Sequence, residues 1–147
     1  MVDSPGLAKK RGKARQLAMQ AIYQWQMTGD EVTGIELQFN EENSASATDM
    51  EYFAELLHGV HTSTDDIDPL LEKYMDRVIL SVDPVERAIL RLATYEFLKR
   101  LDVPYRVVLN EAIALTKKFC AEKSHTFVNA VLDKVAHEIR NQEITNS

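Results

Sequence analysis

Two pairs of side chains in the 147-residue chain are of types that catalyse reactions or bind metals. Cys120 and His125 are a candidate nucleophile and base, but their spacing matches no active-site signature, and a lone cysteine is often a small buried hydrophobe. His58 and His61 lie three residues apart on an expected helix, but no further ligand completes a zinc site. We therefore expect structural roles for all four side chains.

Asp65, Asp66 and Asp68 resemble a fragment of a calcium-binding loop. Pro69 stands where the loop has to continue, and the glycine and terminal glutamate of such a loop are missing. Acids in the first turn of a helix complement its dipole, which explains them without a metal. The sequence also holds no glycine-rich phosphate loop, nucleophile elbow or pair of catalytic carboxylates. It indicates a protein that is not an enzyme and needs no cofactor.

The N-terminus of the chain carries a basic arm. The first 15 residues hold five basic side chains against one acid, Asp3. Such a segment typically contacts phosphates or an acidic surface, and a solvated, poorly ordered end is the alternative. The arm consists of Lys9, Lys10, Arg11, Lys13 and Arg15.

Two aromatic residues are candidate platforms for bases. Tyr23 lies opposite the apolar stripe that its helix forms between Ala14 and Trp25, on the same outer face as Arg15 and Met19, so an exposed ring is expected beside cations. Phe127 lies one turn into a helix that Ser124 is expected to cap, and its helical phase permits either a core position or an RNA platform. The combination favours single-stranded or looped RNA over duplex DNA.

The entry to that helix adds cations and a phosphate-binding geometry. Unpaired N–H groups at a helix start attract phosphate, and Lys117, Lys118 and Lys123 precede it. Glu96 has a different role, because it falls on the apolar face of Val85 and Ile89, where a carboxylate needs hydrogen-bond donors. We expect Glu96 to accept bonds from free N–H groups at the start of the following helix.

The elements that position these residues are all predicted to be helices, because apolar residues recur with helical and not β periodicity. The helix that starts at Asp83-Pro84 is apolar on most sides and leaves only Arg87, Arg91 and Leu98 for solvent, which is typical of the central helix of a bundle. The seven expected helices cover residues 9–27, 32–39, 49–61, 65–78, the segment from 84 to about 101, 104–119 and the segment from 124 to about 139.

Composition and charge set the class of the chain. With 45% hydrophobic and 27% charged residues and a net charge of −6, it reads as an ordinary globular protein. One cysteine excludes an internal disulfide framework, and neither a membrane span nor a secretory signal is recognisable, so we expect a cytoplasmic protein. We expect a flexible leader over residues 1–8, one helical domain over residues 9–143 and a tail over residues 144–147.

The charge is unevenly distributed along the chain. Residues 16–72 contain twelve acids and no lysine or arginine, whereas residues 73–147 are mildly basic. An acidic half of this kind is suited to a basic partner. The alternative to an RNA-binding protein is therefore a helical protein–protein interaction module that binds no RNA.

Four segments resemble the NusB family of transcription antitermination factors, in the right order over about residues 10–140. They are residues 14–25 (ARQLAMQAIYQW), 85–96 (VERAILRLATYE), 103–105 (VPY) with 110–112 (NEA), and 124–129 (SHTFVN). The resemblance implies an all-α, seven-helix fold in which two small helical subdomains pack across each other.

The resemblance also implies a function. It indicates an RNA-binding adaptor that binds boxA-like single-stranded RNA together with a ribosomal protein acting as NusE. With other Nus factors the complex joins RNA polymerase and keeps it elongating, notably on ribosomal RNA operons. The family's RNA surface corresponds to the basic arm, Tyr23, Glu86 and Phe127. Lys123 replaces an acid that is frequent in the family, and this exchange favours attraction to phosphate.

Overall fold

Eight α-helices and one short 3-10 helix carry the chain through residues 4–146, the part that this computed structural model describes. No strand occurs in that part, so the predicted all-α class is confirmed, and an eighth short helix follows the seven predicted ones. The helices are α1 (Pro5–Thr28), α2 (Val32–Glu42), α3 (Met50–Thr62), α4 (Thr64–Glu72), the 3-10 helix η1 (Ile79–Ser81), α5 (Pro84–Lys99), α6 (Tyr105–Phe119), α7 (Ser124–Ile139) and α8 (Asn141–Thr145).

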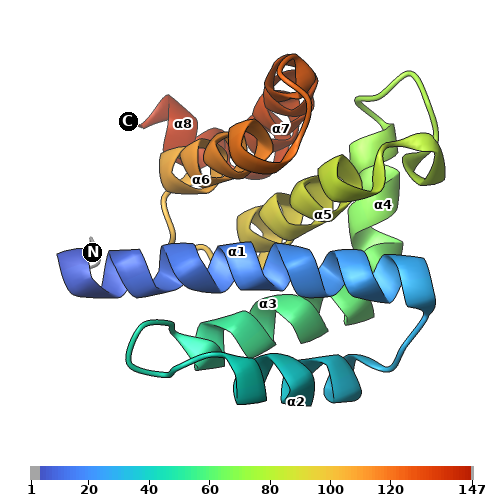
Figure 1. Cartoon of the computed structure of the whole chain (residues 1–147). Helices are drawn as coiled ribbons and strands as arrows, with labels where there is room; N and C mark the ends of the chain where they lie inside the picture. The colour runs from blue at the N-terminus through green and yellow to red at the C-terminus, as the bar shows by residue number, and fades with distance from the viewer. Residues whose placement is uncertain (1–3, 147) are drawn as a thin grey trace.

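The helices form two small groups that meet along α1 and α5 (Figure 1). In one group α2 and α3 pack against α1, and in the other α6 and α7 pack against α5. The long helix α1 also contacts α5, and α4 packs on α5 from the side. The arrangement agrees with the expectation of two subdomains packed across each other.

The first helix begins four residues earlier than its sequence pattern suggests. Ser4 caps it, since its Oγ accepts a hydrogen bond from the Leu7 amide at 3.2 Å, and Pro5 occupies the first helical position. The expected start at Lys9 is therefore wrong, and residues 5–8 of the expected leader are helical. Residues 1–3 of that leader lie outside the described range. Gly29 ends the helix with a φ of 72°, a conformation that glycine adopts without strain.

Other helix ends also differ from expectation, and α2, for example, continues to Glu42 beyond the expected Phe39. α4 stops at Glu72 and not at Val78, and the Glu72 carboxylate accepts the Ile79 amide at 2.7 Å, which stabilises the turn between them. Ser124 is the first residue of α7 and not its cap, because Lys123 holds the cap position. At the C-terminus, α8 extends to Thr145, so the expected tail is helical at residues 144 and 145.

The start of α5 forms as predicted. Asp83 Oδ1 accepts hydrogen bonds from the amides of Val85 (3.0 Å) and Glu86 (3.2 Å). Every residue from Arg87 to Phe97 is buried, which makes α5 the central helix.

The expected solvent-facing arc of α5 is wrong at both of its arginines. Arg87 and Arg91 are buried because α4 and the turn after it cover that side of α5. Arg91 donates to both carboxylate oxygens of Asp68, at 3.0 and 2.7 Å, and Arg87 donates to the Leu80 carbonyl at 3.1 Å.

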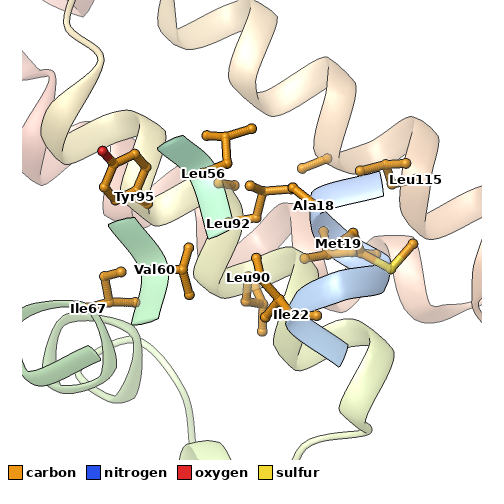
Figure 2. Packing of buried hydrophobic residues seen from close by; sticks show 14 of the residues in the cluster. Ala18, Met19, Ile22, Leu56, Val60, Ile67, Leu90, Leu92, Tyr95 and Leu115 are labelled. Carbon is orange, nitrogen blue, oxygen red and sulfur yellow. The ribbon is translucent and has the colours of Figure 1, made fainter. Parts of the chain in front are cut away.

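The hydrophobic core lies between α1, α3 and α5 and continues to α6 and α7 (Figure 2). Met19, expected on the outer face of α1, is buried in it, because α1 is covered by α3 on one side and α5 on another. α3 and α5 approach so closely at Gly59 that a Cβ there would lie 2.2 Å from the Tyr95 ring. Among the described helices, none combines the length and the hydropathy of a membrane span.

Candidate nucleic-acid interface

One face of α1 remains open to solvent along its whole length. Its members follow one another at spacings of three and four residues, which places them on one side of the helix. They are Lys9, Lys13, Gln16, Gln20, Tyr23 and Met27, all exposed or half-buried. The face therefore runs from lysines at its N-terminal end, through amides, to an aromatic ring.

The basic arm divides between this face and the interior. Lys9 and Lys13 are exposed, as an RNA-binding role requires. Lys10 is half-buried, and its carbonyl accepts the Asp49 amide at 3.2 Å. Arg11 points toward α3, where it pairs with Asp49 (3.5 Å) and stacks over the Tyr52 ring, 4.8 Å from the centroid. The arm is thus the first part of a packed helix.

Arg15 is buried, with 3% of its surface exposed, so the expectation that it shares the outer face of α1 is wrong. Its guanidinium donates to both oxygens of Glu96, at 2.9–3.0 Å, and to Glu111 at 3.3 Å. Burial by itself lowers the pKa of Arg15, but the charge and hydrogen bonds of Glu96 outweigh this and hold the pKa above its ordinary value. Arg15 has no surface left for a phosphate.

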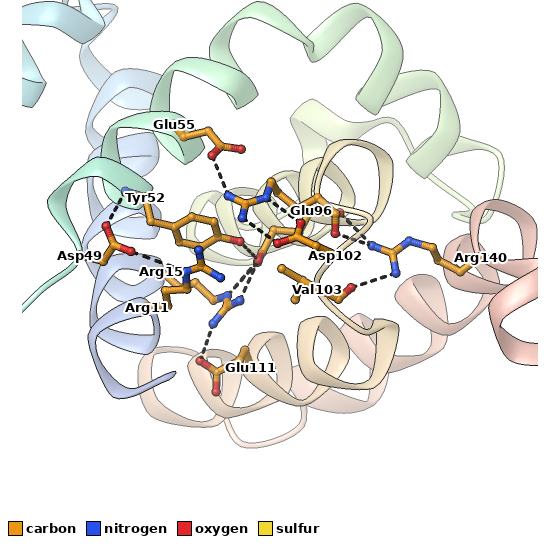
Figure 3. Close-up of polar contacts among 11 residues, drawn as sticks. Arg11, Arg15, Asp49, Tyr52, Glu55, Glu96, Asp102, Val103, Glu111 and Arg140 are labelled. Carbon is orange, nitrogen blue, oxygen red and sulfur yellow. Dashed lines mark hydrogen bonds and ion pairs between the residues drawn. The ribbon is translucent and has the colours of Figure 1, made fainter. Parts of the chain in front are cut away.

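Glu96 is buried and satisfied, as expected, but its partners differ from the expected ones (Figure 3). The donors are the Arg15 guanidinium and the Tyr52 hydroxyl, and not amides of the next helix. Burial and the adjacent Glu96 carboxylate raise the pKa of Tyr52, which keeps its hydroxyl protonated as a donor. Residues from α1, α3 and α5 therefore meet in one buried ionic junction, which joins the two groups of helices.

Arg140 stabilises the same junction from the C-terminal side. Its guanidinium donates to the carbonyls of Glu96, Phe97, Arg100 and Val103, at 2.9–3.1 Å, and so satisfies the end of α5. The sequence carries no local signal for this role, because the four carbonyls lie far from Arg140 along the chain.

A second cluster forms where the first turns of α5 and α7 meet. The Ser124 hydroxyl donates to Glu86 Oε2 at 3.3 Å, and Glu86 is half-buried. Partial burial raises the pKa of the Glu86 carboxyl, as does Asp83, and Ser124 and Arg77 offset part of the effect. Phe127, one turn into α7, is also half-buried and packs partly against the core, so its helical phase leaves part of the ring at the surface.

Two further hydrogen bonds join α1 to helices of the other group. Lys118 in the last turn of α6 donates to Gln16 on the open face of α1 at 3.0 Å. Gln26 of α1 donates to the Pro84 carbonyl at 2.9 Å, which places the end of α1 beside the first turn of α5 and hence near Glu86. Lys123 is exposed at the entry to α7.

Tyr23, 37% exposed, lies in an open groove of about 620 Å³ between α1 and α2. Gln20, Gln24 and Met27 of α1 line one side, and Phe39, Glu42 and Asn43 of α2 line the other. The predicted exposure of Tyr23 is confirmed.

The candidate catalytic pair has no activated nucleophile. Burial, with smaller contributions from Glu86 and Asp83, raises the pKa of Cys120 to about 11, so the thiol is protonated at neutral pH. His125 Nδ1 lies 2.8 Å from the Glu122 carbonyl oxygen.

The candidate metal ligands have structural partners. His58 Nε2 lies 2.7 Å from Glu36 Oε1, and the His61 ring contacts Trp25 edge to face. Asp65 and Asp66 occupy the first turn of α4, as the sequence suggests. Across residues 4–146 no group of three or more His, Cys, Asp or Glu side chains is arranged to hold a metal ion.

A helical fold that exposes lysines on α1, on α6 and at the entry to α7, beside the exposed Tyr23 and the half-buried Phe127, has the features of a nucleic-acid-binding adaptor. Comparison with known proteins identifies the particular family. The model of the NusB family matches residues 12–137, and the chain belongs to that family.

The relatives are similar over nearly the whole chain. The transcription antitermination protein NusB of Pseudomonas savastanoi pv. phaseolicola is 51% identical over 139 residues, which cover 95% of this chain and 84% of the relative. The protein of the same name from Pseudoalteromonas atlantica is 50% identical over 135 residues, covering 92% and 96%.

Solved structures agree with the fold. T. maritima NusB superposes with a TM-score of 0.81 at 28% identity, over 99% of this chain and 100% of that one. A NusB protein in a crystal structure with NusE and double-stranded RNA superposes with a TM-score of 0.75 at 27% identity, over 84% and 93%.

Proposed function

We propose that this protein is an RNA-binding adaptor of transcription antitermination. It binds boxA-like RNA together with a ribosomal protein that acts as NusE, and the complex acts on elongating RNA polymerase, notably on ribosomal RNA operons. The observation that carries the proposal is the open face of α1, which leads from lysines to Tyr23 in a member of the NusB family. A related NusB protein crystallised with NusE and RNA supports both partners.

The RNA site consists of two parts in this proposal. Lys9 and Lys13 contact phosphates from the open face of α1, with Lys10 at its edge, and Lys123 does so at the entry to α7. Arg11 contributes less, because it is engaged by Asp49 and Tyr52. Arg15 is buried in the ionic junction with Glu96 and is not part of this RNA surface.

Three further side chains contact bases. Tyr23 and Phe127 offer ring faces on which unpaired bases stack. Glu86 offers a carboxylate oxygen that accepts a hydrogen bond from the exocyclic amino group of a base, as glutamate does with cytosine. Its contact with Ser124 holds the carboxylate at the surface in one orientation.

The partner protein binds the acidic half of the molecule in this proposal. Residues 16–72 hold twelve acids and no lysine or arginine, so a basic ribosomal protein is attracted to helices α2 to α4 and the adjoining end of α1. Glu42 on the α1–α2 groove is one of these acids. Association should slow as salt rises, and charge reversals in this half should reduce that dependence.

We also infer that the protein is not an enzyme and that it works in the cytoplasm. The protonated Cys120 thiol and the structural contacts of His58 and His61 support the first inference. An antitermination factor acts where RNA is transcribed, which supports the second.

Titration of boxA-like RNA in single- and double-stranded form, against a scrambled RNA of equal length, tests the function. We expect tighter binding of the boxA-like RNA and a further gain when the ribosomal protein is present. Four lysine contacts predict a slope of log affinity against log salt of about −2.8 at most, at about −0.7 per contact with a single strand. Equal affinity for the scrambled RNA would contradict an adaptor that recognises boxA.

The second candidate function is a protein–protein module without RNA, which the acidic half favours. In that case the ribosomal protein binds and no RNA does at any salt concentration. Titration of this protein with the ribosomal protein in the absence of RNA, beside the RNA titration, separates the two functions.

A further inference from the structure

Arg77 lies beside Phe127 although the sequence places it inside an expected helix. α4 ends at Glu72, and the turn that follows brings Arg77 across to the first turns of α7. Its guanidinium carbon lies 4.8 Å from the centroid of the Phe127 ring, so the planar cation covers one face of that ring.

The other contacts of Arg77 are weak. Its side chain is 48% exposed, and its ion pair within the described chain is with the neighbouring residue Asp76, from Nε to Oδ1 at 3.2 Å. Asp76 is itself 85% exposed, and ion pairs between exposed neighbours contribute little to stability. The Nη groups of Arg77 donate none of the hydrogen bonds found across residues 4–146.

The arginines that hold this fold together look different. Arg15, Arg91 and Arg140 are buried, and each donates several hydrogen bonds to carboxylates or carbonyls. Arg77 resembles them only in its contact with a ring. Its side chain is about half exposed, so its Nη donors are accessible to a ligand.

The charge of Arg77 also reaches Glu86. Arg77 opposes the rise in the pKa of the Glu86 carboxyl that burial causes. A carboxylate on an RNA surface repels phosphates, so a glutamate that reads a base needs a cation close by. Arg77 supplies that cation and also covers the Phe127 ring, so one guanidinium acts on both residues.

We propose that Arg77 is a further RNA-binding residue, which stacks with an unpaired base beside Phe127 and contacts an adjoining phosphate through its Nη donors. Arginine planes stack on bases, and the guanidinium fork matches phosphate geometry. This inference rests on the proposed RNA-binding function and adds a specificity-determining residue to it.

The test compares three variants of the full-length chain with the wild type by titration of boxA-like single-stranded RNA over a series of salt concentrations. Arg77→Ala should weaken RNA binding at least about fivefold, the lower end of the range for loss of one stacking contact. It should also make the slope of log affinity against log salt shallower by about 0.7. Arg77→Lys should keep the wild-type slope but not the wild-type affinity, because lysine retains charge without a plane. Lys99→Ala, at the far end of α5 roughly 20 Å from Glu86, should behave as wild type.

The outcomes separate this inference from the function on which it rests. If the wild type binds RNA and Arg77→Ala binds equally well with the same slope, the inference fails and the function stands. If Arg77→Lys has wild-type affinity, the stacking role is wrong. If Arg77→Ala melts much earlier while its folded fraction binds normally, Arg77 is structural. If the wild type binds no RNA, the function and the inference fail together.

Discussion

Near its two ends α5 carries two glutamates in different surroundings. At the C-terminal end the Glu96 carboxylate accepts hydrogen bonds from Arg15 and Tyr52, and all three residues are buried. At the N-terminal end Glu86 is half-buried, and its carboxylate accepts one hydrogen bond within the described residues, from Ser124. Arg77 there covers Phe127 without bonding to the carboxylate.

The difference shows which cluster serves the fold and which is open to a ligand. A buried charge is tolerated only when its partners satisfy it, and the Glu96 junction meets this condition with residues from three helices. In the Glu86 cluster the carboxylate is only half-buried and the Arg77 side chain is about half exposed, so both can reach a ligand. The same residue types are thus structural in one place and available for recognition in the other.

Removal of the buried charge should give the largest effect. Glu96→Gln leaves the Arg15 guanidinium buried without its full counter-charge, so we expect a loss of about 3–5 kcal/mol in the free energy of unfolding. Denaturant unfolding at pH 7 measures it. A loss below about 1 kcal/mol would mean that the junction is not what joins the two groups of helices.

Truncation of the half-buried Phe127 ring should affect RNA binding more than the fold. We expect Phe127→Ala to weaken RNA binding by about 5- to 150-fold, the range for one stacked base. Since Phe127 is only half-buried, Phe127→Ala should lower the melting temperature less than Phe97→Ala does. Phe97 is the fully buried control, and truncation of such a core phenylalanine typically costs about 3–5 kcal/mol of stability. Early melting with normal binding by the folded fraction would place Phe127 in the core.

The lysines of α1 should act through charge. The double substitution of Lys9 and Lys13 by alanine keeps a good helix former at both positions and should reduce the salt slope of RNA binding by about 1.4. This test is sharper than deletion of residues 1–13, which would also remove the Lys10 carbonyl from Asp49. Replacement of Lys99 and Lys134 by alanine is the matched control. Equal slopes for both double variants would exclude the α1 face.

A smaller effect is expected at Tyr23. Its ring is exposed on α1 and makes part of a groove wall, so Tyr23→Ala should leave the melting temperature nearly unchanged. We expect RNA affinity to fall by about fivefold, the lower end of one stacking contact. If RNA binding is unchanged while the ribosomal protein binds more weakly, the groove belongs to the protein partner.

The smallest effect on stability should come from Glu86→Gln. Burial raises the pKa of Glu86 in the folded state above its ordinary 4.5, so folding favours the protonated form. The wild type therefore loses stability as the pH rises from about 4.5 through the folded-state pKa, and the glutamine variant does not. At pH 7 the free energy of unfolding of the variant should equal that of the wild type or be slightly higher, within about 0.5 kcal/mol. Strong destabilisation would make this cluster resemble the Glu96 junction.

Several features of the site follow from local sequence alone. The Asp83-Pro84 signal predicts the start of α5, and the position of Tyr23 opposite its stripe predicts an exposed ring. The same reasoning fails at Arg15, Met19 and Arg87, which are polar or lie outside the main stripe and are nevertheless buried. A single helical stripe describes one packed side, but α1 and α5 are covered on several sides.

Short-range periodicity, capping and composition are enough to predict the all-α class, most of the helix positions, the NusB-family segments and the acidic and basic halves. The burial of Arg15 with Glu96 and Tyr52, and the contact of Arg77 with Phe127, are visible only in the folded chain. Both depend on contacts between residues far apart in the chain, and no local pattern specifies which side of a helix its distant neighbours will cover.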